Sequence, residues 1–343
     1  DDEVTYNAKL KLYQYARRID TRPFCLTVSF THPHDPYLAR QKYWDLYDHG
    51  EIPMPKVPFI DYKDQDPHSQ RLYDANDFRR FEVNEEHIRN ARHAYFANIS
   101  YLDDKLGEIL QVLEECEFDQ NTHVLFCSDH GDMIGERGLW YKMSFFEYSS
   151  RIPLVLYSPN TFSPREVNTP VSNCDVLPSL IELAQGDLNQ LVCDIDGKSF
   201  IELVRGHEDE QRSAYSEYCA EGSIEPMVMI RKGDYKFNYS VSDPVQLFNL
   251  VEDPNELTNL ASAPEYKNLV DSFTEEMHQR WDLTTFKQEV MHSQRCRTLV
   301  DRANRKGHFT PWDFEPPVNG RDRFMRNHMD LNIVESNNRY PKV

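Results

Sequence analysis

The side chains in this sequence that are best suited to chemistry lie in three short segments. Asp129 and His130 stand side by side in the string SDHGD, and Lys142 follows among the aromatic residues of LWYKMSFFE. The string THPHDPY places His32 and His34 on a loop that two prolines stiffen. A carboxylate beside an imidazole is typical of a divalent-metal site, and a lysine among aromatic rings needs an anion to meet its charge. A histidine on a rigid loop is suited to donating a proton.

Each of these segments also has a purely structural interpretation when it is taken alone. An Asp-His pair at a turn can be a helix cap beside a surface imidazole, and a lysine can lay its aliphatic stem along apolar rings. The two histidines can be solvated side chains on a rigid turn. The case for a site therefore depends on the elements that would bring the three segments together.

The pattern of apolar residues predicts the elements that would position these side chains. Residues 24–30 (FCLTVSF) and 123–127 (HVLFC) are predicted to be buried strands, and each runs directly into one of the polar segments. Asn84 predicts the start of a helix that continues to about residue 113, with apolar residues every three or four positions. A strand that ends in a polar loop is how an α/β enzyme presents a site at the carboxyl edge of its sheet.

The remainder of the first 204 residues supports an α/β arrangement around that edge. Helices are expected at 4–18 and 176–184, and a further strand at 151–159. Residues 38–83 are rich in proline, aspartate and tyrosine and lack a sustained period. We expect a long irregular excursion with short helical turns, and such segments in compact domains are more often functional than idle.

From about residue 205 the pattern changes, which predicts a second and smaller unit. MVMIRKGDYKFNYS and PVQLFNL are typical of an antiparallel meander, and an acidic helix is expected near 264–281. From about residue 286 the chain is polar, with isolated aromatic residues and no period, which predicts a tail that wraps over another surface. The predicted units are residues 1–204, 205–285 and 286–343.

The composition excludes several classes of partner. Lys and Arg number 38 against 57 for Asp and Glu, so the net charge is 38 − 57 = −19 and a nucleic-acid backbone would be repelled. No stretch approaches the ~18 consecutive apolar residues of a membrane helix, and we expect no membrane partner. The seven cysteines include no Cys-x-x-Cys pair, which favours reduced thiols and a cytoplasmic location over a disulfide scaffold.

Taken together, the three segments resemble the second signature region of the sulfatase family. In CSDHGDMIGERGLWYKMSFFEYSSRIPLVLYSP, the strings SDHGD and GERG, a lysine and an Arg-Ile-Pro strand occur in the order found in that family. ISYLDDKLGEIL, MVMIRKGDYKF and QLFNLVEDPNELTNLA are similar to sulfatase sequences too, so the resemblance covers at least residues 24–262. Within the family, SFTHPHDPY, GLWYKMSFFE, YSEYCAEG and FMRNHMDLN look most like the choline sulfatases.

The resemblance implies both a fold and an activity. The fold would be the alkaline phosphatase-like α/β fold, with a mixed sheet flanked by helices, a smaller C-terminal α+β subdomain and an extended tail. The activity would be hydrolysis of a sulfate ester, namely choline sulfate, to choline and sulfate. Because phosphonate and phosphate monoester hydrolases of the same superfamily share the SDHG motif, hydrolysis of those esters is one alternative. A non-catalytic oligomerising protein is the other.

The resemblance also implies roles for particular residues. Asp129 and His130 match a pair that binds one divalent cation, which would be calcium, with manganese and magnesium as alternatives. Lys142 matches the lysine that holds a sulfate oxygen. His34 matches the histidine that protonates the departing alcohol, and His32 is a supporting substrate-binding candidate. The roles agree with the chemistry, since charge on the sulfuryl oxygens needs cations to oppose it and an alkoxide leaves poorly unless it is protonated.

Recognition of choline would need aromatic faces and carboxylates around a quaternary ammonium. Trp140, Glu217 and Asp330 are the candidates, the last two because YSEY and NHMDL look like segments of choline sulfatases. The resemblance further implies that the tail joins subunits into a homo-oligomer. Asp330 would then face the substrate pocket of a neighbouring subunit.

The chain departs from the family at the nucleophile. Sulfatases use a formylglycine made from the cysteine of a Cys-x-Pro-Ser-Arg motif, and none of the seven cysteines here is followed by that motif. The early metal-binding aspartates of the family have no match either. We therefore expect the natural protein to contain an upstream region that supplies them, and the 343-residue chain alone to be inactive.

Overall fold

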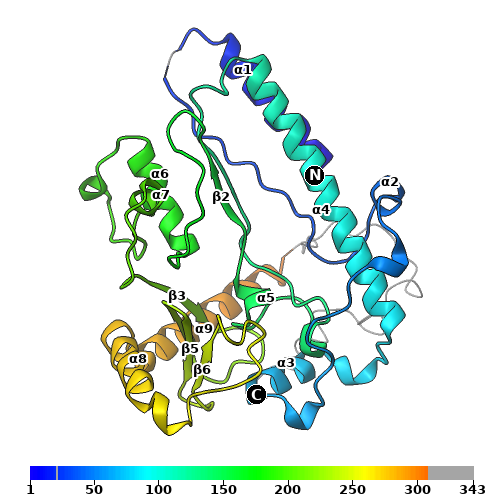
Figure 1. Ribbon diagram of the computed structural model, residues 1–343, viewed down its shortest axis with the longest axis vertical. Helices are drawn as coiled ribbons and strands as arrows, with labels where there is room; N and C mark the ends of the chain where they lie inside the picture. Colours follow the sequence, from blue (N-terminus) through cyan, green and yellow to red (C-terminus); the bar gives the residue numbers. More distant parts are fainter. Residues whose placement is uncertain (21, 308–343) are drawn as a thin grey trace.

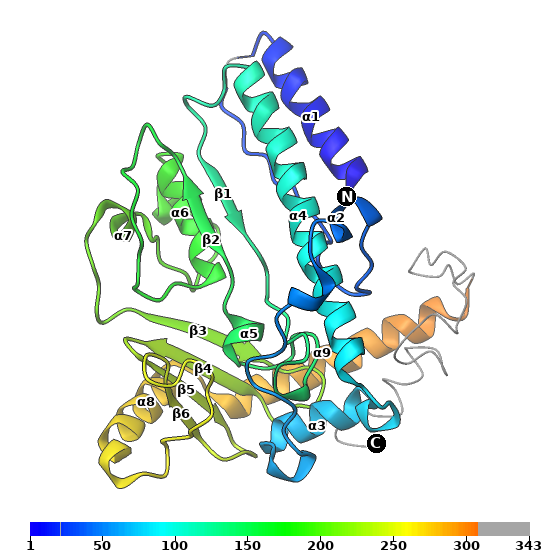
Figure 2. The same ribbon diagram turned by 45° about the vertical axis from the view of Figure 1, so that its right-hand side comes forward.

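The computed structural model describes residues 1–20 and 22–307 (Figures 1 and 2). Helices and strands follow in the order α1 (Asp2–Arg17), α2 (Gln41–Trp44), α3 (Pro67–Ala75), α4 (Glu85–Glu115), β1 (Val124–Cys127), α5 (Glu147–Ser150), β2 (Leu154–Tyr157), α6 (Val176–Leu183), α7 (Ile201–Arg205), β3 (Ser213–Tyr218), β4 (Met227–Lys232), β5 (Tyr235–Ser240), β6 (Gln246–Asn249), α8 (Lys267–Arg280) and α9 (Leu283–Asn304). Helices flank two antiparallel sheets, one of β1 and β2 and one in the order β3-β4-β5-β6.

Helix α4 is the long helix that the apolar spacing predicts. The side chain of Asn84 accepts a hydrogen bond from the backbone N–H of His87, which caps the helix, and Glu85 and Glu86 lie in the first turn, where the helix dipole favours negative charge. The predicted helix at 4–18 is α1, and both figures show it lying along α4. The buried residues between the two helices are Ala8, Leu12, Ile109, Val112 and Leu113.

Residues 24–30 differ from the prediction of a buried strand. The segment is extended, but it has no strand partner among the described residues. Its side chains alternate: Phe24, Leu26, Val28 and Phe30 pack against the α1–α4 cluster, whereas the residues between them are exposed. The run of apolar and β-branched residues predicted the extended backbone correctly. It could not show that helices cover only one face of the segment.

The predicted strands around the polar segments pair with each other. β1 runs antiparallel to β2, with Val124 opposite Tyr157 and Cys127 opposite Leu154. Side chains from this sheet pack against a buried cluster of Phe200, Ile201 and Leu203, which follows α6 along the chain. The strand expected at 151–159 is thus confirmed over its central four residues, and the helix expected at 176–184 is α6.

The second sheet confirms the predicted meander and adds a strand to it. Strands β4, β5 and β6 pair in sequence, and β3 pairs with β4 at the outer edge. Helix α8 covers one face of this sheet, as Figure 1 shows. The core between them is formed by Val228, Ile230, Phe237, Leu247, Phe273, Met277 and Trp281.

Helix α9 corrects the prediction of a tail without period from residue 286. It is a continuous helix that starts beside the second sheet and extends beyond it (Figure 2). The Asp282 side chain caps it by accepting hydrogen bonds from the backbone of Thr284 and Thr285, and Leu283 is its one buried residue. A helix that packs on so little needs no apolar stripe, which is why the sequence shows no period. Residues 308–343, including Asp330, lie outside the described residues.

None of the helices in the described part of the chain combines the length and the apolar character that crossing a membrane requires.

Candidate active site

His34 and Lys142, which are 108 residues apart in the sequence, are in direct contact. Lys142 Nζ lies 2.7 Å from His34 Nε2. Because an ammonium group can only donate, His34 accepts at Nε2 and carries its own proton on Nδ1. That proton is donated to the backbone oxygen of Asp35, 2.9 Å away, and the Asp35 carboxylate lies 3.0 Å from the same nitrogen. The predicted acid and the predicted cation thus share one place in the structure.

His130 and Asp129 lie beside this pair. The ring of His130 is 5.9 Å from the ring of His34, centroid to centroid, in an edge-to-face arrangement. His130 Nδ1 donates to the backbone oxygen of Gly131 at 2.7 Å, which leaves a lone pair on Nε2. The Asp129 carboxylate accepts the backbone N–H of His130 at 3.0 Å, and its side chain is 86% exposed.

These two side chains fit part of a divalent-metal site. Metal-binding histidines commonly donate the other ring N–H to a backbone carbonyl, as His130 does, and Asp129 offers an exposed carboxylate 3.6 Å from His130 Nε2. Within residues 1–20 and 22–307, no cluster of three or more His, Cys, Asp or Glu side chains is arranged to hold a metal. Asp129 and His130 could therefore supply two of the several ligands that such an ion needs.

The backbone that carries Asp129 and His130 is held tightly from two sides. The N–H of Gly131 donates to the oxygen of Ser149 in α5 at 2.7 Å. A side-chain carbon at Gly131 would lie 2.1 Å from the oxygen of Tyr148, so only glycine permits this approach. On the other side, the Asn173 amide donates to the oxygens of Ser128 and Asp129, both at 3.2 Å.

Asp132, the last residue of SDHGD, joins the two loops that carry His34 and Lys142. Its carboxylate accepts the hydroxyl of Tyr37 at 2.8 Å and the backbone N–H of Tyr141 at 3.1 Å. Burial raises the pKa of the Asp132 carboxyl and raises that of the Tyr37 hydroxyl well above its ordinary value. The motif alone gives Asp132 no role, because a motif does not show which of its side chains point inward.

His32 pairs with Asp1 and not, as a supporting role would suggest, with the predicted acid or the predicted cation. Its Nδ1 is 2.6 Å from the carboxylate of Asp1, and its ring packs edge-on against Tyr101. Burial lowers the pKa of His32. Within the described residues it makes no hydrogen bond or ring contact with His34 or Lys142, so its role in substrate binding stays a prediction.

The choline-binding candidates lie in different parts of the structure. Trp140 is 8% exposed and belongs to an aromatic cluster, where its ring is 6.1 Å from that of Tyr37. Glu217 lies on β3, and its carboxylate accepts a hydrogen bond from the indole N–H of Trp281 at 2.6 Å. The sequence does not mark Trp281 as a site residue, because it precedes a polar helix far from any motif. Asp330 is outside the described residues.

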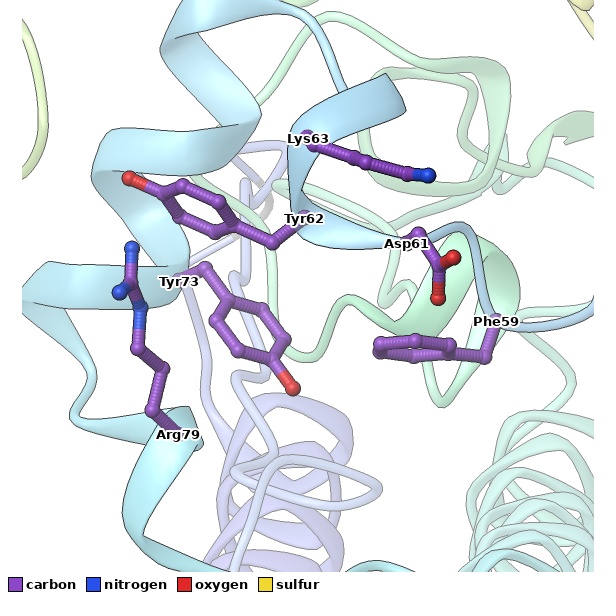
Figure 3. Close-up of a pocket in the computed structure, with 6 residues that line it drawn as sticks. All are labelled: Phe59, Asp61, Tyr62, Lys63, Tyr73 and Arg79. Atoms are coloured by element: carbon purple, nitrogen blue, oxygen red, sulfur yellow. The ribbon is translucent and has the colours of Figure 1, made fainter.

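An open cavity of about 480 Å³ lies among residues of the segment 38–83, which the sequence predicts to be irregular. Figure 3 shows the six residues that line it: Phe59, Asp61, Tyr62, Lys63, Tyr73 and Arg79. The Arg79 guanidinium stacks 3.7 Å from the centre of the Tyr62 ring and pairs with Asp74 at 2.8 Å. None of the predicted site residues lines this cavity.

Comparison with protein families places the site in a known context. Residues 1–186 match the family described as Sulfatase. Residues 135–282 match "N-sulphoglucosamine sulphohydrolase, C-terminal", and residues 288–340 match "Choline sulfatase enzyme C terminal". The first match begins ahead of His34 and ends beyond Lys142, so it includes all the residues that the structure brings together.

Individual proteins agree with these matches. The chain is 47% identical to a choline-sulfatase of Rhizobium meliloti over 100% of its own length and 68% of that protein's. It is 28% identical to an arylsulfatase of Clostridium perfringens over 74% of the chain and 53% of that protein. The chain thus spans between about half and about two thirds of the length of these relatives.

The fold is shared with solved structures as well. The phosphonate monoester hydrolase of Agrobacterium radiobacter superposes with a TM-score of 0.64 at 21% identity, covering 80% of this chain and 60% of that one. This likeness confirms the predicted alkaline phosphatase-like α/β fold. With the family match over more than half of its length and the full-length identity to a choline-sulfatase, the chain belongs to the sulfatase family.

Proposed function

We propose that the natural protein hydrolyses a sulfate ester and that its substrate is choline sulfate. The observation that carries this proposal is the contact between Lys142 Nζ and His34 Nε2 beside His130. A cation and a proton carrier side by side are what departure of an alcohol from a sulfuryl group requires. The identity to a choline-sulfatase along the whole chain supports the choice of substrate.

In the proposed reaction Lys142 changes partner when substrate binds. A sulfate oxygen takes the place of His34 as the acceptor for the ammonium, so negative charge on the sulfuryl group meets a fixed cation. His34 is thereby released at Nε2 and can take up a proton from solvent there, while the backbone oxygen of Asp35 holds Nδ1 in place. The imidazolium then protonates the departing alcohol oxygen, which would otherwise leave as an alkoxide.

Two further parts are proposed from the family. Asp129 and His130 would contribute ligands to one divalent cation, with calcium as the proposed ion. Such an ion would supply Lewis-acid stabilisation of the sulfuryl oxygens. The nucleophile would be a formylglycine, and no cysteine of this chain lies in the motif that produces it. We therefore propose that this chain supplies the acid His34, the cation Lys142 and two ligands of the metal ion.

For the choline group we propose an acidic site that includes Glu217 and Asp330. Glu217 is exposed on β3, and the hydrogen bond from Trp281 fixes its carboxylate beside an indole. A carboxylate next to an aromatic ring is suited to a quaternary ammonium. Trp140, being buried, would act by supporting the ring of Tyr37.

We also propose a homo-oligomer formed through the C-terminal segment. Helix α9 extends beyond the second sheet and exposes Met291, Leu299 and Val300 at 42%, 70% and 58%. Apolar residues on a helix that packs on so little of its own chain are suited to a second copy. The match of residues 288–340 to the choline sulfatase C-terminal family supports this assignment.

The proposed activity is tested on the protein encoded by the natural gene. Steady-state hydrolysis is measured with choline sulfate, an aryl sulfate, a phosphate monoester and a phosphonate monoester. We expect the highest kcat/KM with choline sulfate. Lys142→Ala should lower kcat/KM for both sulfate esters by about 100-fold, since one charge-stabilising group is lost.

The control is Lys267→Ala, which removes an exposed lysine of α8 that is paired with Asp271. This variant should keep wild-type rates. Faster hydrolysis of the phosphonate than of either sulfate would replace the proposal with the phosphonate hydrolase alternative. A lack of turnover with all four esters would favour a non-catalytic protein.

A further inference from the structure

The backbone on either side of Lys142 has an unusual conformation. Tyr141 has φ 65° and Met143 has φ 53°, so two residues with large side chains adopt the left-handed region that normally favours glycine. Such a conformation is costly and persists only where the surroundings hold it in place. Lys142 sits between these two residues, so whatever holds them also sets the direction of its side chain.

Asp132 holds the first of these residues. One carboxylate oxygen accepts the backbone N–H groups of Tyr141 at 3.1 Å and Ile134 at 2.9 Å. The N–H of Met133 also donates to the oxygen of Tyr141 at 2.6 Å, so the Tyr141 peptide is held on both sides. The second carboxylate oxygen accepts the hydroxyl of Tyr37, three residues after His34.

His68 holds the second residue from a different element. It lies in the first turn of α3, is 4% exposed, and its Nε2 donates to the backbone oxygen of Met143 at 2.7 Å. Burial lowers the pKa of His68, so the imidazole is neutral and Nε2 carries its single proton. Its Nδ1 is buried without a hydrogen-bond partner in the part of the chain that the structure describes. This proton therefore serves Met143 alone.

We propose that Asp132 and His68 are positioning residues for Lys142, a role that rests on the proposed function of Lys142 in holding a sulfate oxygen. Asp132 holds the residue before Lys142, and His68 holds the residue after it. Without either contact, the neighbouring peptide relaxes to the ordinary region of φ and ψ, and the side chain of Lys142 leaves His34. Through Tyr37, the Asp132 carboxylate also fixes the loop that carries His34.

The test compares two variants at His68 in the protein encoded by the natural gene. His68→Leu removes the donor to Met143, whereas His68→Gln can place an N–H near the position of Nε2. The control is His93→Leu, because His93 is also fully buried and donates Nε2 to a backbone oxygen, that of Trp44, at 2.9 Å. His93 lies on α4, and its hydrogen bonds and ring contacts within the described residues are with Trp44, Tyr47 and His49, away from the segment around Lys142.

The first measurement needs no substrate. The free enzyme is treated briefly with an acetylating N-hydroxysuccinimide ester, and acetylation of Lys142 is quantified by peptide mass spectrometry. In the wild type the ammonium is held against His34 and should react slowly. His68→Leu should raise this rate by about threefold or more, since the flexible side chain of Lys142 is then no longer held against His34 and the reagent reaches its amine more easily. His68→Gln and His93→Leu should match the wild type.

The second measurement is steady-state hydrolysis of an aryl sulfate. His68→Leu should lower kcat by about 100-fold with little change in KM, because misplacing a group that acts in the transition state reduces kcat. His68→Gln should recover most of this loss. If His68→Leu does not fold, Asp132→Ala is compared with Asp132→Asn instead. Asp132→Ala removes the acceptor for the backbone N–H of Tyr141, whereas the amide oxygen of Asn can still accept from it.

Unchanged acetylation of Lys142 in the folded Leu or Ala variants would overturn the proposal. So would an equal loss of kcat in His68→Leu and His93→Leu, which would show a general effect of losing a buried hydrogen bond. If the wild type hydrolyses no sulfate ester, the proposed function fails. The acetylation result still decides whether Asp132 and His68 position Lys142.

Discussion

The contact between Lys142 Nζ and His34 Nε2 constrains what each residue can do. While Lys142 donates to Nε2, His34 cannot carry a proton there. In the reaction proposed above, His34 becomes an acid only after a sulfate oxygen has replaced it as the acceptor for the ammonium. Substrate binding and proton transfer would then be coupled through this one hydrogen bond.

This coupling leads to a prediction for His34→Ala. The rate should fall by about 100-fold or more for choline sulfate, whose alcohol is a poor leaving group, because general acid catalysis is lost. An activated aryl sulfate departs without a proton and should lose much less. The measurement is kcat/KM for a series of sulfate esters of increasing leaving-group pKa. An equal loss across the series would mean that His34 binds substrate and does not act as the acid.

Asp129 gives a second prediction at this scale. Asp129→Ala should lower the divalent metal content of the purified natural protein, as measured by elemental analysis, because an exposed carboxylate beside His130 Nε2 is lost. Asp119→Ala removes a partly exposed carboxylate just ahead of β1 and is the control. Full metal content in Asp129→Ala would show that Asp129 is not a ligand.

His68 gives a prediction about stability and pH. Burial lowers its pKa below the ordinary value of 6.5, so the unfolded chain binds a proton that the folded chain resists. The contribution of neutral His68 to the free energy of unfolding is therefore intact above pH 6.5 and is lost as the pH falls from there through the lowered pKa. The free energy of unfolding in urea, measured between about pH 7 and pH 5, should fall with acidity in the wild type and fall less in His68→Gln. Parallel curves would contradict this prediction.

The sequence identified some site residues and missed others for a physical reason. His34, Asp129, His130 and Lys142 stand in recognisable strings, and the structure brings them together. His68 stands in a helical stretch, PHSQRLYDA, that has the composition of many surface helices. Its function depends on a carbonyl 75 residues away in the sequence, and no local pattern records such a contact.

Among the elements, β5 is tied to α5 by a buried lysine. Lys236 is 1% exposed, and its Nζ lies 2.7 Å from the backbone oxygen of Phe145 and 2.7 Å from a carboxylate oxygen of each of Glu147 and Glu256. The backbone of Glu147 donates to the same Glu256 carboxylate at 2.7 Å. The second sheet therefore holds the segment that follows Lys142.

This arrangement predicts a large effect of Lys236→Met. Removing Lys236 leaves the buried Glu256 carboxylate without a cation, and the free energy of unfolding should fall by about 3 kcal/mol. Adding Glu256→Gln to the same variant should restore part of the loss, since the second charge is then absent as well. Urea unfolding followed by circular dichroism measures both values. A double variant less stable than Lys236→Met would contradict this explanation.

The elements show where sequence patterns succeed. The long apolar period of α4 and its Asn84 cap are local, so both were predicted. Residues 24–30 are predicted to be a buried strand, because an apolar run looks the same with one covered face or two. Helix α9 was missed because the apolar period that reveals a helix comes from packing, and α9 packs on little of its own chain. The boundaries at residues 204 and 285 stay predictions.

At the scale of the whole molecule, the C-terminal segment is expected to connect subunits. Deleting residues 290–343 from the natural protein removes most of α9, with its exposed Leu299 and Val300, and Asp330. The deletion should lower the oligomeric mass measured by light scattering. It should also raise KM for choline sulfate more than KM for an aryl sulfate, because only choline carries a charge that Asp330 could oppose.

The point variant Asp330→Asn separates the two effects. It should keep the oligomeric mass and raise KM for choline sulfate alone. If the deletion variant retains both its mass and its preference for choline sulfate, the assignment of the C-terminal segment is wrong.

The alternating packing of residues 24–30 has a consequence for aggregation of the protein. FCLTVSF has no charge and no proline, and it is rich in β-branched and aromatic residues, which is the signature of segments that stack into amyloid-like zippers. The helices α1 and α4 keep its apolar face covered. Loosening of α1 on heating would uncover that face while the backbone is already extended. We therefore expect the packing of α1 and α4 on this segment to limit aggregation as well as to form part of the core.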